Sequence, residues 1–185
     1  MDLAFVTRVP QDSIPEGSTE SDKGANTTGS IYISNRVTAE SVPVLRNHGI
    51  TTVITMIEPD RTPGARRTTG FTEHKKANIK HYRFNIPDET IYPYERPKFL
   101  ATVRLAIRTA RNALLRGEKV LIHCRSGVNR SPLTIGLLLV EEFGMSPSEA
   151  LDLVTQANEQ RQVPVLINES FRDLIAMAVP KQCMM

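Results

Sequence analysis

Apolar and polar positions along the chain follow two spacings, which predict short strands separated by helices. Short apolar runs rich in β-branched residues indicate buried strands, and they lie near 31–33, 52–57, 79–86 and 119–122. Segments with apolar residues three or four positions apart indicate helices that bury one face, and they lie at 37–48, 94–116, 130–140, from 146 onward and at 168–179. Strands that alternate with helices predict a single α/β domain, with a central, largely parallel sheet of about four or five strands flanked by helices.

The two ends of the chain and one internal stretch lack this periodicity. Residues 1–29 are polar and rich in Ser, Thr, Gly and Pro, and predict a flexible arm before a domain at 30–179 and a tail at 180–185. The apolar residues at 3–6 leave open that the arm packs on the domain or on a partner. The stretch 58–77 contains Pro and Gly breakers and predicts a loop.

The most informative stretch is HCRSGVNRS at 123–131, between a predicted strand and a predicted helix. The strand ends near Cys124 and the helix begins near Arg130, so the loop between them is short. Such a loop at a helix N-terminus can turn its backbone N–H groups toward an anion. Gly127 permits the positive φ that this turn needs. Arg130 adds a planar guanidinium that can donate to two phosphate oxygens at once.

The same positive field favours the thiolate form of Cys124, and the thiolate is the nucleophilic form of cysteine. A thiolate under a bound phosphate can attack phosphorus. The alternative interpretation is a buried structural cysteine that precedes a helix.

The leaving oxygen of a phosphate ester needs a proton, so a carboxylic acid must lie near this loop. Asp88 follows the strand at 79–86, and the carboxyl ends of parallel strands share one edge of the sheet. We therefore predict Asp88 as the general acid, with Glu89 as the alternative acid. A helix-capping role for Asp88 is the interpretation without chemistry.

The stretch 123–131 resembles the signature of the cysteine-dependent phosphatases, in which His-Cys is followed by five residues, Arg, and Ser or Thr. It is most similar to the small, atypical dual-specificity protein phosphatases. Further resemblance lies in the strands at 31–35 and 49–54, and in Arg161 followed by the Asn-Glu-Ser-Phe motif at 168–171. The resemblance implies that fold, and hydrolysis of phosphotyrosine, phosphoserine and phosphothreonine in proteins through a cysteinyl-phosphate.

Each candidate residue then has an expected role. Cys124 attacks phosphorus, Arg130 binds the equatorial oxygens, and Ser131 donates its hydroxyl to the departing sulfur, caps the helix, or does both. The backbone N–H groups that bind phosphate belong to Arg125, Ser126, Gly127, Val128, Asn129 and Arg130. By resemblance, His123 orders the loop beneath the sulfur. Arg161 either lies at a second anion site or forms a surface ion pair.

Two other functions remain open from the sequence. One is a phosphatase of the same superfamily that acts on phosphoinositides or RNA 5′-triphosphate ends; lipid-directed relatives usually carry more Lys in the loop than this chain, which has Val128 and Asn129. The other is a catalytically weak phosphate-binding module. No Tyr in 58–77 could wall a deep phosphotyrosine cleft, so we expect a shallow pocket.

Composition limits the partners. Lys and Arg number 23 against 20 Asp and Glu, a net charge of +3, so no nucleic-acid partner is expected. His48, His74 and His81 have no metal-ligand spacing with His123, so no metal or other cofactor is expected. The expected partners are phosphorylated proteins, and the assembly state stays open.

Compartment follows from the two cysteines, of which Cys183 lies near the C-terminus. A catalytic thiol must stay reduced, which indicates the cytoplasm, with nuclear access possible. No apolar segment is long enough to span a membrane and no signal-peptide pattern opens the chain, so no membrane association is expected.

Overall fold

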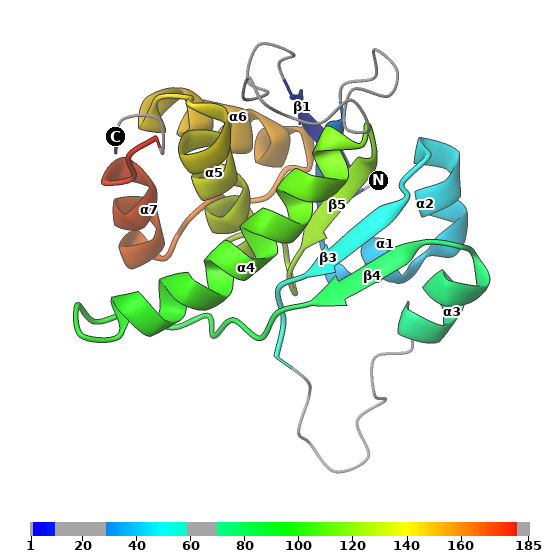
Figure 1. The fold of residues 1–185 in the computed structure, drawn as a ribbon, viewed down its shortest axis with the longest axis horizontal. Coiled ribbons are helices and arrows are strands. Elements are labelled where there is room, and N and C mark those ends of the chain that lie inside the picture. The colour runs from blue at the N-terminus through cyan, green and yellow to red at the C-terminus, as the bar shows by residue number, and fades with distance from the viewer. Residues whose placement is uncertain (1, 10–28, 59–69, 181–185) are drawn as a thin grey trace.

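The computed structural model describes residues 2–9, 29–58 and 70–180. In this part of the chain, one five-stranded sheet in the order β1-β2-β5-β3-β4 is flanked by helices (Figure 1). The strands are β1 (Leu3–Arg8), β2 (Ser30–Ser34), β3 (Thr52–Thr55), β4 (Lys80–Arg83) and β5 (Lys119–His123). The helices are α1 (Arg36–Glu40), α2 (Val42–His48), α3 (Gly70–Lys76), α4 (Arg96–Leu115), α5 (Arg130–Phe143), α6 (Pro147–Gln160) and α7 (Glu169–Ala176). All strand pairs are parallel except β1 with β2, which confirms the predicted α/β domain with a largely parallel sheet.

The sheet separates two hydrophobic cores, because successive side chains of a strand point to opposite faces. In β5, Val120 and Ile122 face the larger core, which α4 to α7 cover. Leu121 faces the smaller core, together with Leu45 of α2. A central strand buried on both faces explains why the run at 119–122 is continuously apolar.

Helix α5 is the centre of the larger core. Every residue of α5 except Glu142 is buried, as its nearly uniform apolar sequence predicts. Gly136 lets Ile175 of α7 approach, since a Cβ at this position would overlap the Ile175 side chain. The N-terminus of α5 is thereby fixed at the carboxyl edge of the sheet, directly after β5.

The prediction of a flexible arm over 1–29 was wrong for Leu3–Arg8. These residues form β1, which pairs with β2 and packs against α6. Ala4 and Val6 are buried on one side of this edge strand, so the alternative that 3–6 packs on the domain is the one observed. The strand was missed because it covers the edge of β2, a long-range pairing with no local signal. Residues 10–28 lie outside the described residues.

Three helix boundaries also differ from the prediction. The segment 37–48 forms two helices, because Pro43 lacks an N–H and Ser41 between the helices has extended backbone angles. The long helix begins at Arg96 instead of residue 94, after a turn at 92–95. The predicted loop at 58–77 contains α3 at its end, where His74 is buried without the periodic apolar pattern that marks a helix; residues 59–69 lie outside the description.

Two helix ends follow from local sequence signals. Ser146 and Glu149 form the capping box that opens α6, with reciprocal side-chain to backbone hydrogen bonds. Gly49 ends α2 in the left-handed conformation at φ 68°. In the described part of the chain, no helix combines the length and apolar character needed to cross a bilayer.

Replacing Leu138 tests the central position of α5. Leu138 is 0% exposed, so Leu138→Ala should lower the free energy of unfolding by about 2–5 kcal/mol through lost burial and a residual cavity. The matched control is Leu105→Ala on α4, where the side chain is 46% exposed and the cost should stay within about 0.5 kcal/mol. Urea unfolding measures both variants, and equal losses would contradict this placement of α5.

Candidate active site

The loop after β5 holds the sulfur of Cys124 at its base. Cys124 is 0% exposed. Its Sγ accepts hydrogen bonds from the backbone N–H of Gly127 at 3.2 Å and from Oγ of Ser131 at 3.3 Å. Two donors aimed at one sulfur stabilise negative charge on it. Ser131 lies inside α5, whose N-cap is Asn129, so the capping alternative for Ser131 is wrong.

In this loop the backbone carbonyl groups point away from the side on which the N–H groups lie, toward neighbouring segments of the domain. Each carbonyl from 125 to 128 accepts a hydrogen bond: Arg125 from the N–H of Arg36, Ser126 from Arg161, Gly127 from Arg161 and Asn158, and Val128 from the N–H of Leu166. The carbonyl of Cys124 lies 3.2 Å from Nδ1 of His123. Because the carbonyls point away, the N–H groups of the loop and of the first turn of α5 remain available to bind an anion.

Gly127 has two reasons to be glycine. Its φ is +73°, the left-handed conformation that the sequence predicted. A Cβ at this position would also overlap the guanidinium of Arg161. A side chain here would therefore disturb both the turn and the residue that supports it.

Arg130 lies in the first turn of α5 and is only 7% exposed. Its Nη1 donates to the carbonyl of Ile86 at 3.3 Å, and its Nη2 pairs with Oδ2 of Asp88 at 3.3 Å. Its Nε is buried without a hydrogen-bond partner among the described residues. A buried N–H of this kind is costly unless it has an acceptor, so the residues present favour an anion at this position.

The structure places Asp88 at the loop, on the segment that follows β4. Besides the ion pair with Arg130, Oδ1 of Asp88 accepts a hydrogen bond from Nδ2 of Asn129 at 3.0 Å. The helix-capping alternative for Asp88 is wrong, since the N-cap of α4 is Glu95. Glu89 contributes its backbone carbonyl to Asn168 at 2.9 Å, and no contact of its carboxylate with the loop is found within the described residues.

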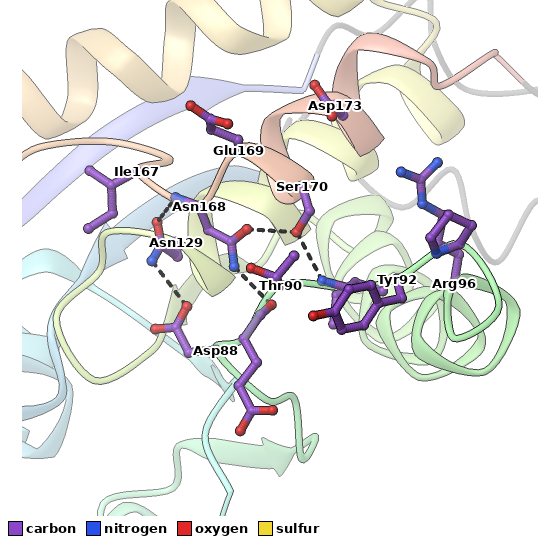
Figure 2. A pocket seen from close by; sticks show the side chains of 13 residues that line it. Asp88, Thr90, Tyr92, Arg96, Asn129, Ile167, Asn168, Glu169, Ser170 and Asp173 are labelled. Carbon is purple, nitrogen blue, oxygen red and sulfur yellow. Dashed lines mark hydrogen bonds between the residues drawn. The ribbon is translucent and has the colours of Figure 1, made fainter.

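Asn129 and Asn168 connect this acidic segment to the start of α7 (Figure 2). Oδ1 of Asn129 accepts from the backbone N–H of Asn168 at 3.1 Å, and Ser170 donates to Asn168 while accepting from the N–H of Ile91. The amides and the hydroxyl thus hold segments that are about 80 positions apart in the sequence. A pocket of about 820 Å³ lies here, lined by Asp88, Tyr92, Arg96, Asn129 and Asp173 among others.

Neither sequence interpretation of Arg161 describes its position. Its side chain is 0% exposed and pairs with Asp2 at 2.6 Å. The same guanidinium donates to Oδ1 of Asn158 and to the carbonyls of Ser126 and Gly127 at 2.8–3.1 Å. Arg161 is therefore a buried support of the loop instead of a second anion site or a surface ion pair.

His123 lies beneath the loop, as the resemblance implied. Its Nδ1 is 3.2 Å from the carbonyl of Cys124, and its Nε2 is 2.7 Å from Oγ1 of Thr55. Burial lowers the pKa of His123 to about 3, only partly opposed by the hydrogen bond to Cys124. His123 is therefore a neutral hydrogen-bonding residue at physiological pH.

Sequence reasoning missed four residues that this site uses. They are Thr55, Asn158, His81 and Asp2, which contact His123, Gly127, Thr55 and Arg161 respectively. All four lie far from the motif in sequence, and none has a local signal. Only the fold brings them to the loop.

Known proteins resemble the chain over most of its length. A family model described as dual specificity phosphatase, catalytic domain, matches residues 31–178. A protein of Invertebrate iridescent virus 3 named as a putative tyrosine phosphatase is 34% identical over 115 residues, 58% of this chain and 47% of that protein. The chain therefore matches about half the length of this viral relative.

Two solved structures share the fold. The crystal structure of kinase associated phosphatase, with its catalytic-site cysteine replaced by serine, has a TM-score of 0.65 at 15% identity and covers 94% of this chain and 90% of that one. The structure of PTPMT1 in complex with PI(5)P has a TM-score of 0.60 at 19% identity and covers 79% and 87%.

Removing the Arg161 side chain should strongly lower the stability of the domain. Arg161→Met leaves the Asp2 carboxylate and the Ser126 carbonyl without this donor, and the Gly127 carbonyl with Asn158 alone, so the free energy of unfolding should fall by about 3–5 kcal/mol. The control is Arg116→Met, which removes a half-exposed side chain from Glu118 while this carboxylate keeps Lys80 and Thr52 as partners, and it should cost no more than about 1 kcal/mol. Urea unfolding measures both, and similar small losses would show that Arg161 does not support the loop.

Proposed function

Since the chain belongs to the dual specificity phosphatase catalytic-domain family and is a cysteine-based phosphatase, we propose that it hydrolyses phosphotyrosine, phosphoserine and phosphothreonine in proteins through a cysteinyl-phosphate. The observation that carries the proposal is the grouping of three side chains around one turn. Cys124 lies under the turn, Arg130 carries a buried Nε–H without a hydrogen-bond partner in the described part of the chain, and Asp88 pairs with Arg130.

In the first step of the proposed mechanism, the phosphate of the substrate takes the place of the Asp88 carboxylate on Arg130. The Arg130 guanidinium and the loop N–H groups bind the equatorial oxygens, which they hold most strongly as the phosphoryl group flattens. The Cys124 thiolate forms the S–P bond while the P–O bond to the substrate breaks. Asp88, released from Arg130 and protonated, gives its proton to the leaving oxygen.

In the second step, a water molecule attacks phosphorus and the S–P bond breaks. Asp88, now a carboxylate, takes a proton from that water. The electron pair of the S–P bond returns to Cys124, and the hydroxyl of Ser131, 3.3 Å from the sulfur, donates to the thiolate as it forms. Inorganic phosphate leaves, and the site regains its first state.

The choice of a protein substrate rests on two supports. The viral relative is named for tyrosine phosphatase activity, and the pocket of about 820 Å³ beside Asp88 can take residues next to the phosphorylated one. The likeness to PTPMT1, at 19% identity, concerns the fold alone. The part of the 58–77 stretch on which the shallow-pocket expectation depends lies mostly outside the described residues.

A substrate panel tests the proposal directly. The full chain is assayed for phosphate release from phosphotyrosine, phosphoserine and phosphothreonine peptides, from phosphoinositides in vesicles, and from RNA with a 5′-triphosphate. We expect kcat/KM to be highest on the peptides. A higher kcat/KM on a phosphoinositide or on RNA would show that this molecule, and not a protein, is the preferred substrate. No turnover on any phosphoester would indicate a phosphate-binding module.

Cys124→Ser should abolish turnover while phosphate binding remains. A serine hydroxyl keeps the shape of the site but ionises too weakly to attack phosphorus, so kcat should fall on the order of 10⁴–10⁶-fold, as for other lost nucleophiles. Stopped-flow assays measure the loss, and anisotropy with a labelled phosphopeptide measures the binding. Turnover within tenfold of the wild type would exclude the covalent route.

Asp88→Asn should lower kcat most on substrates whose leaving oxygen most needs a proton. We expect losses of about 10²–10⁴-fold in kcat on phosphoserine and phosphothreonine peptides and much smaller losses on a nitrophenyl phosphate. The matched control is Glu89→Gln, a neighbouring carboxylate, and a larger loss from this control would move the acid to Glu89.

A further inference from the structure

Behind the catalytic loop, a continuous row of hydrogen-bonding side chains crosses the sheet. It begins at the carbonyl of Ala39 in α1, passes through α3, β4 and β3, and ends at the carbonyl of Cys124 under the loop after β5. Among the described residues it consists of five contacts: Ala39 O to His74 Nε2 at 2.9 Å, His74 Nδ1 to His81 Nδ1 at 2.9 Å, His81 Nε2 to Thr55 Oγ1 at 2.7 Å, Thr55 Oγ1 to His123 Nε2 at 2.7 Å, and His123 Nδ1 to Cys124 O at 3.2 Å.

The number of protons in this row does not match the number of contacts. Each contact needs one hydrogen between its two atoms. Both end atoms are backbone carbonyl oxygens, which only accept. Three neutral imidazoles and one hydroxyl supply four hydrogens, whereas there are five contacts. All five can be hydrogen bonds only when one imidazole carries a second proton.

The geometry points to His81 as the imidazole that takes the second proton. His74 and His123 are buried, and burial lowers the pKa of both. His81 is only partly buried and lines a pocket of about 570 Å³ between α3 and β4, together with Phe71, Lys75 and Lys80. Protons can therefore reach His81 from solvent.

The direction of the row depends on that proton. When His81 is doubly protonated, it donates to both His74 and Thr55. The Thr55 hydroxyl then donates to Nε2 of His123, and Nδ1–H of His123 donates to the carbonyl of Cys124. When His81 is neutral and donates to His74, the hydrogen bonds between His81 and His123 change direction. The Thr55 hydroxyl then donates to Nε2 of His81, and Nε2–H of His123 donates to Thr55. Nδ1 of His123 then presents a lone pair to the Cys124 carbonyl, at the longest of the five contacts.

We propose that His81, Thr55 and His74 are positioning residues for the catalytic loop, and that protonation of His81 switches His123 from the Nε2–H to the Nδ1–H tautomer. The switch supplies an N–H to the carbonyl of Cys124, the first of the outward carbonyls on which the turn depends. The effect on catalysis rests on the function proposed above, whereas the tautomer switch does not.

Some charged groups around the row favour a positive charge on its histidines, and others oppose it. On α1, Glu40 raises the pKa of His74, and Arg36 lowers that of His123; Arg83 of β4 also lowers it. Lys75 of α3 and Lys80 of β4 line the pocket and oppose a second positive charge. The Phe71 ring stacks on His81, with centroids 3.9 Å apart and planes 6° apart, and an aromatic face favours a cation.

Nitrogen-15 spectra of the histidine rings in the full chain test the switch, because they distinguish the two tautomers and the cation. As pH falls, we expect His81 to become doubly protonated and His123 to change tautomer with the same midpoint. In Thr55→Val, which removes the linking hydroxyl, His81 should still titrate while His123 keeps one tautomer. His48→Gln is the control, since the His48 ring bonds only the Val44 carbonyl among the described residues, and it should leave the switch unchanged.

A fixed His123 tautomer in the wild type, a different midpoint, or an unchanged switch in Thr55→Val would overturn the proposal. If Thr55→Val does not fold, His81→Gln takes its place, and His123 should then keep one tautomer at every pH. Thr55→Ser, which restores a hydroxyl, should restore the coupling.

The catalytic consequence is measured as the ratio of kcat/KM for wild type and Thr55→Val on an aryl phosphate across pH. The ratio isolates the effect of the Thr55 hydroxyl, because the two proteins differ in that residue alone. It should rise about three- to tenfold below the His81 midpoint, the worth of about one hydrogen bond. A flat ratio with an intact tautomer switch would refute the positioning role alone. A wild type without turnover would refute the proposed function, and with it the positioning role, but leave the spectra to decide the tautomer switch.

Discussion

The site depends on one backbone constraint: a loop that turns its N–H groups toward an anion must turn its carbonyls away from it. Those carbonyls point away from the anion and into the surrounding protein, where each one needs a hydrogen-bond donor. The chain supplies donors from α1, from α6 and from the segment between α6 and α7. Much of the domain outside the motif therefore serves to satisfy the reverse side of one turn.

Buried charge follows from the same constraint. Arg161 supports the turn from behind, and Arg130 faces its other side, so two guanidinium groups lie close to a loop that must also attract an anion. Each has a carboxylate partner, Asp2 for Arg161 and Asp88 for Arg130. The two carboxylates are about equally exposed, 26% for Asp2 and 31% for Asp88, and the pairs differ in distance: Asp2 lies 2.6 Å from Arg161, whereas Asp88 lies 3.3 Å from Arg130 and gives way to phosphate in the proposed mechanism.

The N-terminal strand acquires a function through Arg161. Asp2 immediately precedes β1, and pairing of β1 with β2 carries this carboxylate to the end of α6. Edge strands commonly protect a sheet from unwanted pairing. Here the edge strand also contributes a charge to the support of the catalytic loop, which couples the start of the chain to its most buried functional element.

Local sequence determined the parts of this protein whose physics is local. The strand, the turn with positive φ at Gly127 and the helix that begins at Arg130 lie within about twelve residues, and residue type alone fixes their conformation. The position of Asp88 could also be predicted, because parallel strands bring their carboxyl ends to one edge. The capping box of α6 and the burial of α5 follow from spacing in the same way.

Only the tertiary structure decided which distant residues support the loop. Asp2, Thr55, His81 and Asn158 have no sequence pattern, because one hydrogen bond needs a single donor or acceptor at the right place and leaves no periodic trace. The pairing of β1 was hidden for a related reason: an edge strand of six residues is defined by its neighbour in the sheet instead of by its own composition. Arg161 belongs to both categories, since its presence was visible in the sequence, whereas its burial against four partners is a property of the fold.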